Sequence, residues 1–255
     1  MQKKTGLEKK KIYFVSDAHL GLPAETDSFT REKMLVEWLK KAAVDAQKII
    51  LLGDIFDFWF EYRYAVPKGF TRLLGTLAQL KDEGVDIDFY IGNHDMWTFG
   101  YLAEETGINV IYEPRIEEFY GKKFYIAHGD GLGPYDKSYK RLKKIFTNKL
   151  ARFLFRWLHP DIGIWLAHTW SHKSRYNEGD DHTPFLGEDK EWLALYAKSI
   201  LSHTHIDYFI FGHRHIDNTI KLNENSYLYY TGDWLKLFSY LVYDESGLQL
   251  KYYKK

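Results

Sequence analysis

The sequence contains no cysteine, which excludes disulfide bonds and any site where thiolates hold zinc or an iron–sulfur cluster. It also lacks an excess of either charge, because 35 basic and 35 acidic residues give a formal net charge of +0. The protein as a whole is therefore not built to attract a polyanion, and no nucleic acid is expected as a partner. No apolar stretch approaches the ~18 residues of a membrane-spanning helix. The apolar run after the basic N-terminus is too short for a secretion signal, so we expect a cytoplasmic protein.

The composition that is present indicates a globular protein with a sizeable core. The chain has 255 residues, of which 45% are hydrophobic and 18% aromatic, so it can form one large domain or two small ones.

Apolar runs rich in strand-forming residues alternate with helical patterns, and several strand patterns follow one another near the end. The predicted strands are 11–16, 48–54, 86–95, 108–112 and 206–215, with a hairpin from Arg115 to His128, and the predicted helices are 29–44, 70–81 and 98–106. This order predicts an α/β layered sandwich with mixed sheets. Residues 136–204 break the pattern because they are helical and aromatic. We interpret them as a cap inserted between two core segments, 1–135 and 205–255.

Five of the predicted strands end in the same way, with an apolar run followed by Asp, Asn or His. In α/β sheets, ligands bind beyond the carboxyl ends of the strands, so these side chains are expected to gather at one edge. Any one of these endings is explained equally well as a turn or a cap, but five together indicate a shared site. The residues are Asp17, His19, Asp54, Asn93, His94, Asp95, His128, His213 and His215.

Seven of these residues form a set of candidate metal ligands. Two Asp, one Asn and four His are too many for one four-coordinate ion, and they suit two ions that share a carboxylate. Nitrogen and oxygen ligands without thiolate favour Mn, Fe or Zn over Ca or Cu(I). The set is Asp17, His19, Asp54, Asn93, His128, His213 and His215.

The motifs D-x-H, G-D-x-x-D, G-N-H-D, H-G-D and G-H-x-H, in this order, resemble the calcineurin-like metallophosphoesterase superfamily. The resemblance implies a four-layer αββα sandwich of two mixed sheets with a helical cap insertion. It implies one metal held by Asp17, His19, Asp54 and His215. It also implies a second metal held by Asp54, Asn93, His128 and His213, with Asp54 as the bridge.

A narrower resemblance is to the UDP-2,3-diacylglucosamine hydrolases of lipid A synthesis. It rests on "SDAHLG", "LLGDIFDFW", "YGKKFYIAHGDGL" and the cap entry "DKSYKRLKKIF". It implies two divalent metal ions as cofactors, with Mn as the first choice and Zn, Fe or Mg as alternatives. It implies that the enzyme cleaves a UDP-linked glycolipid to UMP and 2,3-diacylglucosamine 1-phosphate. It also implies reversible attachment to the cytoplasmic face of the inner membrane of a Gram-negative-type bacterium. The chain departs from this family at His94, where members typically carry Arg and generic metallophosphoesterases carry His.

Three residues at the end of the third predicted strand, Asn93, His94 and Asp95, are expected to serve catalysis. His94, beside Asn93, is expected to stabilise phosphoryl charge or protonate the leaving group. Asp95 is expected either to orient His94 or to cap the loop. Asp57 is expected to support the site rather than to ligate a metal. The resemblance to the UDP-2,3-diacylglucosamine hydrolases further implies that residues of the cap bind substrate, at Asp136, Ser171, Lys173 and Arg175.

The cap begins with a basic, apolar segment. Residues 137–160 contain no acidic residue. Their apolar side chains recur at steps of three and four: Tyr139, Leu142, Phe146, Leu150, Phe153 and Trp157. Such a stripe is typical of a helix packed on a core, but with a basic face it equally suits the headgroup layer of an anionic membrane.

Two other functions compete with the lipid-sugar diphosphatase. One is a phosphoesterase acting on another ester, such as a nucleotide, a nucleic acid or a phosphoprotein. The other is a non-catalytic interaction module on the same fold. In a module of that kind we would expect some metal-ligating residues to be replaced, whereas all seven candidate metal ligands are present in this sequence.

Overall fold

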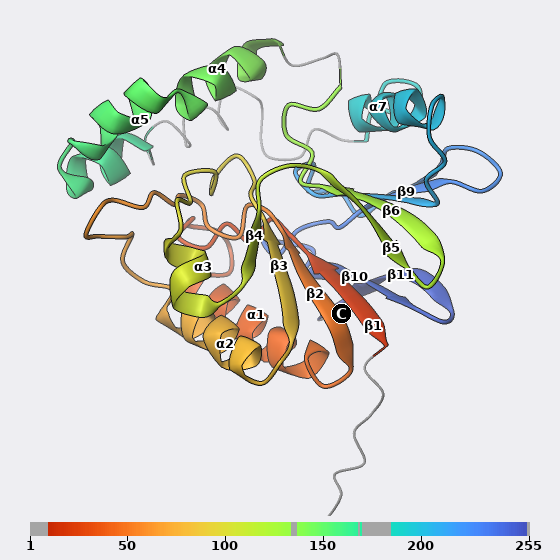
Figure 1. Ribbon diagram of the computed structural model, residues 1–255, viewed down its shortest axis with the longest axis horizontal. Coiled ribbons are helices and arrows are strands. Elements are labelled where there is room, and N and C mark those ends of the chain that lie inside the picture. The colour runs from red at the N-terminus through yellow and green to blue at the C-terminus, as the bar shows by residue number, and fades with distance from the viewer. Residues whose placement is uncertain (1–9, 134–136, 168, 170–184, 254–255) are drawn as a thin grey trace, which may run out of the picture.

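The computed structural model describes residues 10–133, 137–167, 169 and 185–253, which form two sheets packed face to face (Figure 1). Alternating apolar residues of both sheets meet in a shared core that includes Phe14, Ile50, Phe124 and Ile210. The layered α/β prediction is therefore confirmed.

The six-stranded sheet has the order β11-β10-β1-β2-β3-β4. Its parallel strands are β1 (Lys11–Val15), β2 (Ala46–Leu52), β3 (Asp86–Tyr90) and β4 (Asn109–Ile111). The antiparallel edge is formed by β10 (Ser239–Asp244) and β11 (Gly247–Tyr252). Parallel strands place all their carboxyl ends at one edge, which is where the polar motifs begin.

The five-stranded sheet has the order β5-β6-β7-β9-β8. Its parallel centre is β6 (Lys122–Ala127), β7 (Tyr208–Phe211) and β9 (Tyr227–Tyr230). The antiparallel edges are β5 (Arg115–Phe119) and β8 (Thr219–Lys221). The predicted hairpin from Arg115 to His128 is the β5–β6 pair.

Helices form the two outer layers (Figure 1). Helices α1 (Ser28–Ala42), α2 (Thr71–Asp82) and α3 (Tyr101–Thr106) cover the six-stranded sheet. Helix α7 (Trp192–Leu201) covers the five-stranded sheet through Leu193, Ala194 and Ala197. Because α7 packs on a sheet, the carboxyl-terminal part of the range 136–204 belongs to the layered core and not to a separate cap.

The cap helices α4 (Lys137–Thr147) and α5 (Lys149–Arg156) lie above the carboxyl ends of the strands (Figure 1). They are separate because Asn148 caps α5, its side chain accepting hydrogen bonds from the N–H groups of Leu150 and Ala151. This break changes the face that the apolar stripe presents. Tyr139, Leu142 and Phe146 are partly buried, whereas Leu150, Phe153 and Trp157 are exposed, so only the first half of the predicted stripe packs inward.

The predicted strands are too long at their carboxyl ends. Strand β3 ends at Tyr90 and β7 at Phe211, although the predictions ran to residues 95 and 215. Helix α3 begins at Tyr101, after Gly100, rather than at residue 98. The polar residues that follow each strand form loops, because they turn toward one point instead of continuing the ladder.

Candidate active site

Six parallel strands, three from each sheet, direct their following loops to one place, and five of these loops carry the predicted metal ligands. The loops after β1, β2 and β3 carry Asp17 and His19, Asp54, and Asn93 and His94. The loops after β6 and β7 carry His128 and the pair His213 and His215. Backbone bonds join neighbouring loops, for example from the N–H of His19 to the carbonyl of Asp54 at 2.9 Å. The structure thus brings all seven predicted metal ligands to one edge.

Two glycines of the motifs are required by close approach to ligand side chains. A Cβ atom added to Gly92 would lie 2.1 Å from Oδ1 of Asp54. A Cβ atom added to Gly53 would lie 2.6 Å from Nδ1 of His128. The glycines of G-D and G-N-H-D therefore let one loop rest against the ligand carried by the next loop.

Five of the seven candidate ligands adopt the left-handed backbone region, which non-glycine residues rarely occupy. The φ angles lie between 40° at His19 and 65° at His213. Such conformations cost free energy and persist only where the surroundings enforce them. The residues are Asp17, His19, Asp54, His213 and His215.

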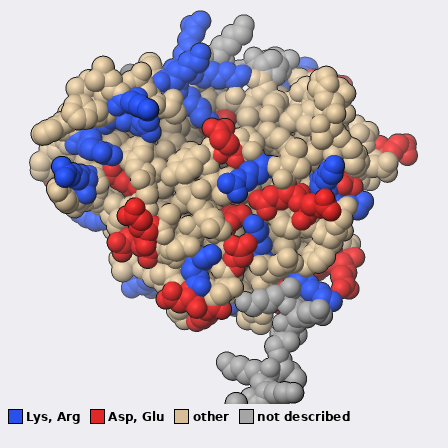
Figure 2. Space-filling view, viewed as in Figure 1, with Lys and Arg blue, Asp and Glu red and all other residues tan. Residues whose placement is uncertain are grey.

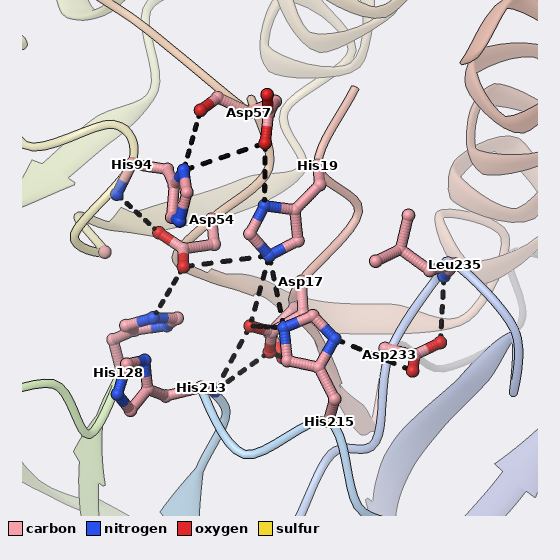
Figure 3. Close-up of polar contacts among 12 residues, drawn as sticks. Asp17, His19, Asp54, Asp57, His94, His128, His213, His215, Asp233 and Leu235 are labelled. Carbon is pink, nitrogen blue, oxygen red and sulfur yellow. Dashed lines mark hydrogen bonds and ion pairs between the residues drawn. The ribbon is translucent and has the colours of Figure 1, made fainter. Parts of the chain in front are cut away.

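Asp17, His19 and His215 form the first group, with one possible ligand atom from each within 4.8 Å of the others. Nε2 of His215 lies 3.4 Å from Oδ1 of Asp17, and the Nε2 atoms of His19 and His215 are 3.2 Å apart (Figure 3). The other oxygen of Asp17 accepts the N–H of His213 at 3.0 Å, which fixes the carboxylate.

Asp54, His128 and His213 form the second group. Oδ2 of Asp54 lies 3.1 Å from Nε2 of His128 and 3.8 Å from Nε2 of His19, so this atom sits between the two groups (Figure 3). Nδ1 of His128 contacts the carbonyl of Leu52 at 2.8 Å, which leaves Nε2 to face Asp54. This is the position that the prediction of a bridging Asp54 requires.

His94 lies beside both groups. Its N–H donates to Oδ1 of Asp54 at 2.8 Å, and its Nδ1 lies 2.7 Å from the carbonyl of Asp57 (Figure 3). A ring bonded to a carbonyl through Nδ1 carries its proton there, so Nε2 is the atom that faces a ligand. His94, His19 and Asp54 also bring possible ligand atoms within 4.8 Å of one another.

Two buried carboxylates support the site in different ways. Oδ1 of Asp57 lies 3.5 Å from Nδ1 of His19 and 3.7 Å from Nδ1 of His94, which suits the expected supporting role. Asp95 instead accepts the backbone N–H groups of Gly92 and Ile55, at 2.6 Å and 2.9 Å. Of the two roles expected for Asp95, these bonds support the loop cap, because both carboxylate oxygens are used to hold loops.

The sequence reasoning missed Asp233, which follows β9 by the rule that places the other site residues. Its Oδ2 lies 3.7 Å from Nδ1 of His215, and its Oδ1 accepts the N–H groups of Leu235, Lys236 and Leu237. A carboxylate behind a ligating imidazole fixes the ring orientation. The run "YYTGD" has the same form as "LLGD", and this likeness was the available signal.

A buried ion pair holds the loop that carries His213 and His215. Nε of Arg214 donates to Oε1 of Glu191 at 2.7 Å, and Nη2 donates to Oε2 at 3.2 Å. The guanidinium also lies 4.4 Å from the ring centre of Trp192. The two ligand histidines are thus fastened through Arg214 to the start of α7.

The charges of the site fit divalent cations. Burial opposes ionisation of Asp54, but the charges of His128 and His94 outweigh it and hold the pKa of Asp54 well below its usual value. Burial opposes the charged form of His19, yet Asp17 and Asp57 raise its pKa to about 10. Without metal, the carboxylates therefore require protonated histidines. Oδ1 of Asn93 is buried without a hydrogen-bond partner among the described residues, as an oxygen reserved for a ligand would be.

The predicted substrate residues Asp136, Ser171, Lys173 and Arg175 lie outside the described residues.

Metal binding is expected to release protons, because ligating histidines must be neutral. At pH 7, the raised pKa values of His19 and His128 keep both rings protonated in the metal-free protein, whereas burial and the charge of His128 lower the pKa of His213 to about 4. Loading both sites should release about two protons, and affinity should rise with pH between 7 and 8. Calorimetry of Mn²⁺ binding in buffers of different ionisation enthalpy measures this. Identical heats in all buffers would contradict it.

Removing the charge of Glu191 is expected to destabilise the fold. The variant Glu191→Gln leaves the buried Arg214 without its carboxylate, and such a loss costs about 3–5 kcal/mol. Urea unfolding at pH 7 measures the change in free energy. Exposed Glu188→Gln, three residues earlier, is the matched control and should unfold like the wild type.

Comparisons with known proteins place the chain in a family. Residues 10–217 match the family model described as calcineurin-like phosphoesterase. The chain is 40% identical over 255 residues to the UDP-2,3-diacylglucosamine hydrolase of Porphyromonas gingivalis, covering 95% of this chain and 97% of that protein. It is 26% identical over 244 residues to the protein of the same name from Histophilus somni, covering 94% and 99%.

Among solved structures, a dimetal phosphatase from Danio rerio aligns with a TM-score of 0.49 and 13% identity over 96% of each chain. The family model and the 40% identical relative both extend over most of the chain. This protein therefore belongs to the calcineurin-like phosphoesterase family, and it is a hydrolase.

Proposed function

We propose that this protein hydrolyses the diphosphate of UDP-2,3-diacylglucosamine to UMP and 2,3-diacylglucosamine 1-phosphate. The main support for this substrate is the 40% identity to a protein named UDP-2,3-diacylglucosamine hydrolase. The match covers 95% of the chain, so it includes the cap as well as the core. A resemblance limited to the site loops would support only a phosphoesterase.

We propose two divalent cations as cofactors, with Mn²⁺ first. Asp17, His19, Asp54 and His215 would hold one, and Asp54, Asn93, His128 and His213 the other. When bound, such a pair lowers the pKa of a water molecule to near neutral and offsets charge on phosphoryl oxygens. The donor set supports this assignment, because imidazole and carboxylate together suit Mn, Fe or Zn.

His94 is proposed to act on the phosphoryl group or the leaving oxygen. Its Nδ1 is used by the carbonyl of Asp57, so Nε2 is the atom that can donate to phosphate. Oδ1 of Asp57 lies 3.7 Å from the same Nδ1 atom and supports this orientation of the ring. Asn93, on the same loop, is proposed to hold a metal and to take part in catalysis beside His94.

A second candidate is a phosphoesterase acting on another phosphomonoester or diester. It is favoured by His94, since generic metallophosphoesterases carry His where the lipid A enzymes typically carry Arg. The two candidates share the metal site and differ in whether the cap contributes to binding.

The cap supports a lipid substrate through its exposed surface. Helix α5 has no buried residue, and Leu150 and Trp157 are 66% and 76% exposed. Phe153, Leu154, Trp165 and Leu166 are also exposed. Exposed patches of this kind mark sites that meet apolar partners.

Basic residues accompany the apolar surface, and Figure 2 shows Lys and Arg gathered over α4 and α5. Arg141, Lys144, Lys149 and Arg156 are exposed. Lysines and arginines near an anionic leaflet contribute about 1 kcal/mol each. We therefore propose reversible, peripheral attachment to the cytoplasmic face of the inner membrane. Among the described residues, no helix is long and apolar enough to cross a membrane.

The substrate is tested by the products. With Mn²⁺, wild-type protein should release UMP, and no inorganic phosphate, from UDP-2,3-diacylglucosamine far faster than it cleaves bis(p-nitrophenyl) phosphate. Chromatography of the products in Mn, Mg, Zn and Co measures this preference. Faster turnover of the soluble diester with every metal would favour the second candidate.

Two substitutions test the assigned roles. Asp54→Ala should abolish turnover together with metal binding. His94→Ala should lower kcat by ~10²–10⁴ with metal content unchanged, the range for one acid–base group. Steady-state kinetics with metal analysis measure both. A change of KM alone in His94→Ala would assign His94 to substrate binding instead.

Membrane docking is tested with Arg141→Glu, Lys144→Glu and Lys149→Glu combined. Lys140 and Lys143 are left intact, because they contact the carbonyl of Gly133 and the carboxylate of Asp130. Sedimentation with anionic vesicles should fall by an order of magnitude or more if each charge contributes about 1 kcal/mol. Hydrolysis of the soluble diester should be unchanged. Equal sedimentation of wild type and variant at low salt would refute docking through this face.

A further inference from the structure

The first cap helix is tied to the loop that carries His128. Asp130 lies two residues after His128, and its carboxylate is buried. Oδ2 accepts hydrogen bonds from the hydroxyl of Tyr139 and the ammonium of Lys143, each at 2.6 Å. Tyr139 and Lys143 are one helical turn apart on α4, so both meet the carboxylate from the same face.

The backbone of this loop is shaped to receive α4. Gly131 has φ +66°, and a Cβ atom added there would lie 3.2 Å from Cε1 of Tyr139. Lys140 donates to the carbonyl of Gly133. The helix therefore rests on residues 130–133 through side chains and through close backbone contact.

The other end of α4 is tied to the loop that carries Asn93 and His94. Nε1 of Trp97, three residues after His94, donates to the carbonyl of Phe146 at 2.9 Å. The ring centroids of Trp97 and Phe146 are 5.1 Å apart, and the two rings pack edge to face at 71°. Helix α4 thus spans from the His128 loop to the His94 loop.

The contact at Asp130 is specific to two positions of α4. Burying a carboxylate costs free energy unless the group is hydrogen-bonded and paired with a positive charge. Tyr139 supplies a hydrogen bond, and Lys143 supplies a hydrogen bond and the positive charge. Arg141 carries the same charge on the same helix but is exposed. A general attraction for basic residues therefore does not explain the arrangement.

We propose that Asp130, Tyr139 and Lys143 form a clamp that positions α4 over the metal site and thereby sets the affinity for substrates that use the cap. The clamp takes no part in breaking the phosphoanhydride bond, so its residues are positioning residues. The proposal rests on the proposed function for the identity of the cap-dependent substrate, UDP-2,3-diacylglucosamine.

The kinetic test uses Lys143→Met and Tyr139→Phe with Mn²⁺ and substrate in neutral-detergent micelles, where docking to anionic lipid plays no part. In Lys143→Met, KM for UDP-2,3-diacylglucosamine should rise about tenfold, as expected for the loss of one charge-assisted hydrogen bond. Its kcat, its metal content and its cleavage of bis(p-nitrophenyl) phosphate should stay within about twofold of wild type. Lys143→Arg should restore KM, and the matched control Arg141→Met should behave as wild type.

Amide hydrogen exchange over 137–147, measured without substrate, separates the clamp from the proposed function. Exchange should be faster in Lys143→Met and Tyr139→Phe than in wild type and Arg141→Met. Unchanged exchange with unchanged KM would overturn the clamp, and equal losses on both substrates would overturn its restriction to the cap. If wild type releases no UMP while exchange responds as expected, the proposed substrate fails and the clamp on α4 stands.

Discussion

The carboxylates of Asp17 and Asp54 are buried at the meeting point of two sheets, where each requires a nearby positive charge. Much of the surrounding structure follows from this requirement. Loops from six parallel strands converge so that His19, His128 and His215 lie within 4 Å of one or both carboxylates. Without metal, protonated imidazoles compensate the charge, and divalent cations compensate it when they are bound.

The same convergence explains the local strain. Five candidate ligands have positive φ, because each loop must turn back over the end of its strand to reach the shared point. Glycines remove the Cβ atoms that would collide with neighbouring ligands, as at Gly92 against Asp54. Arg214 and Glu191 hold another loop by a buried ion pair. The free-energy cost of the site is thus offset by contacts in the surrounding layers.

Much of this arrangement follows from the sequence. Repeated strand endings predicted that Asp17, Asp54 and His128 would gather although they are distant in the chain, because parallel strands share an edge. Asp233 was missed because its strand lies in a run of strands without helices between them. In such a run, Gly-Asp after a strand is typical of a turn between neighbouring strands. The sequence left two roles open for Asp95, and only the structure selects the loop cap, because neighbouring residues in a sequence need not point at one another.

The cap was harder to predict for a physical reason. A stripe at helical spacing shows which residues share a face only while the helix is continuous, and Asn148 ends that continuity. The basic residues of 137–160 therefore divide into two kinds. Lys143 meets Asp130 and fastens the cap to the site, whereas Lys144 and Lys149 face solvent. Only the three-dimensional structure separates these roles.

The converging loops are proposed to hold two metal ions around a shared Asp54, and crystals grown with Mn²⁺ and measured at the manganese absorption edge would locate them. Two anomalous peaks are expected about 3.5–4 Å apart, one beside Asp17, His19 and His215 and one beside His128 and His213, with Asp54 between them. A single peak, or two peaks that do not share Asp54, would contradict this proposal.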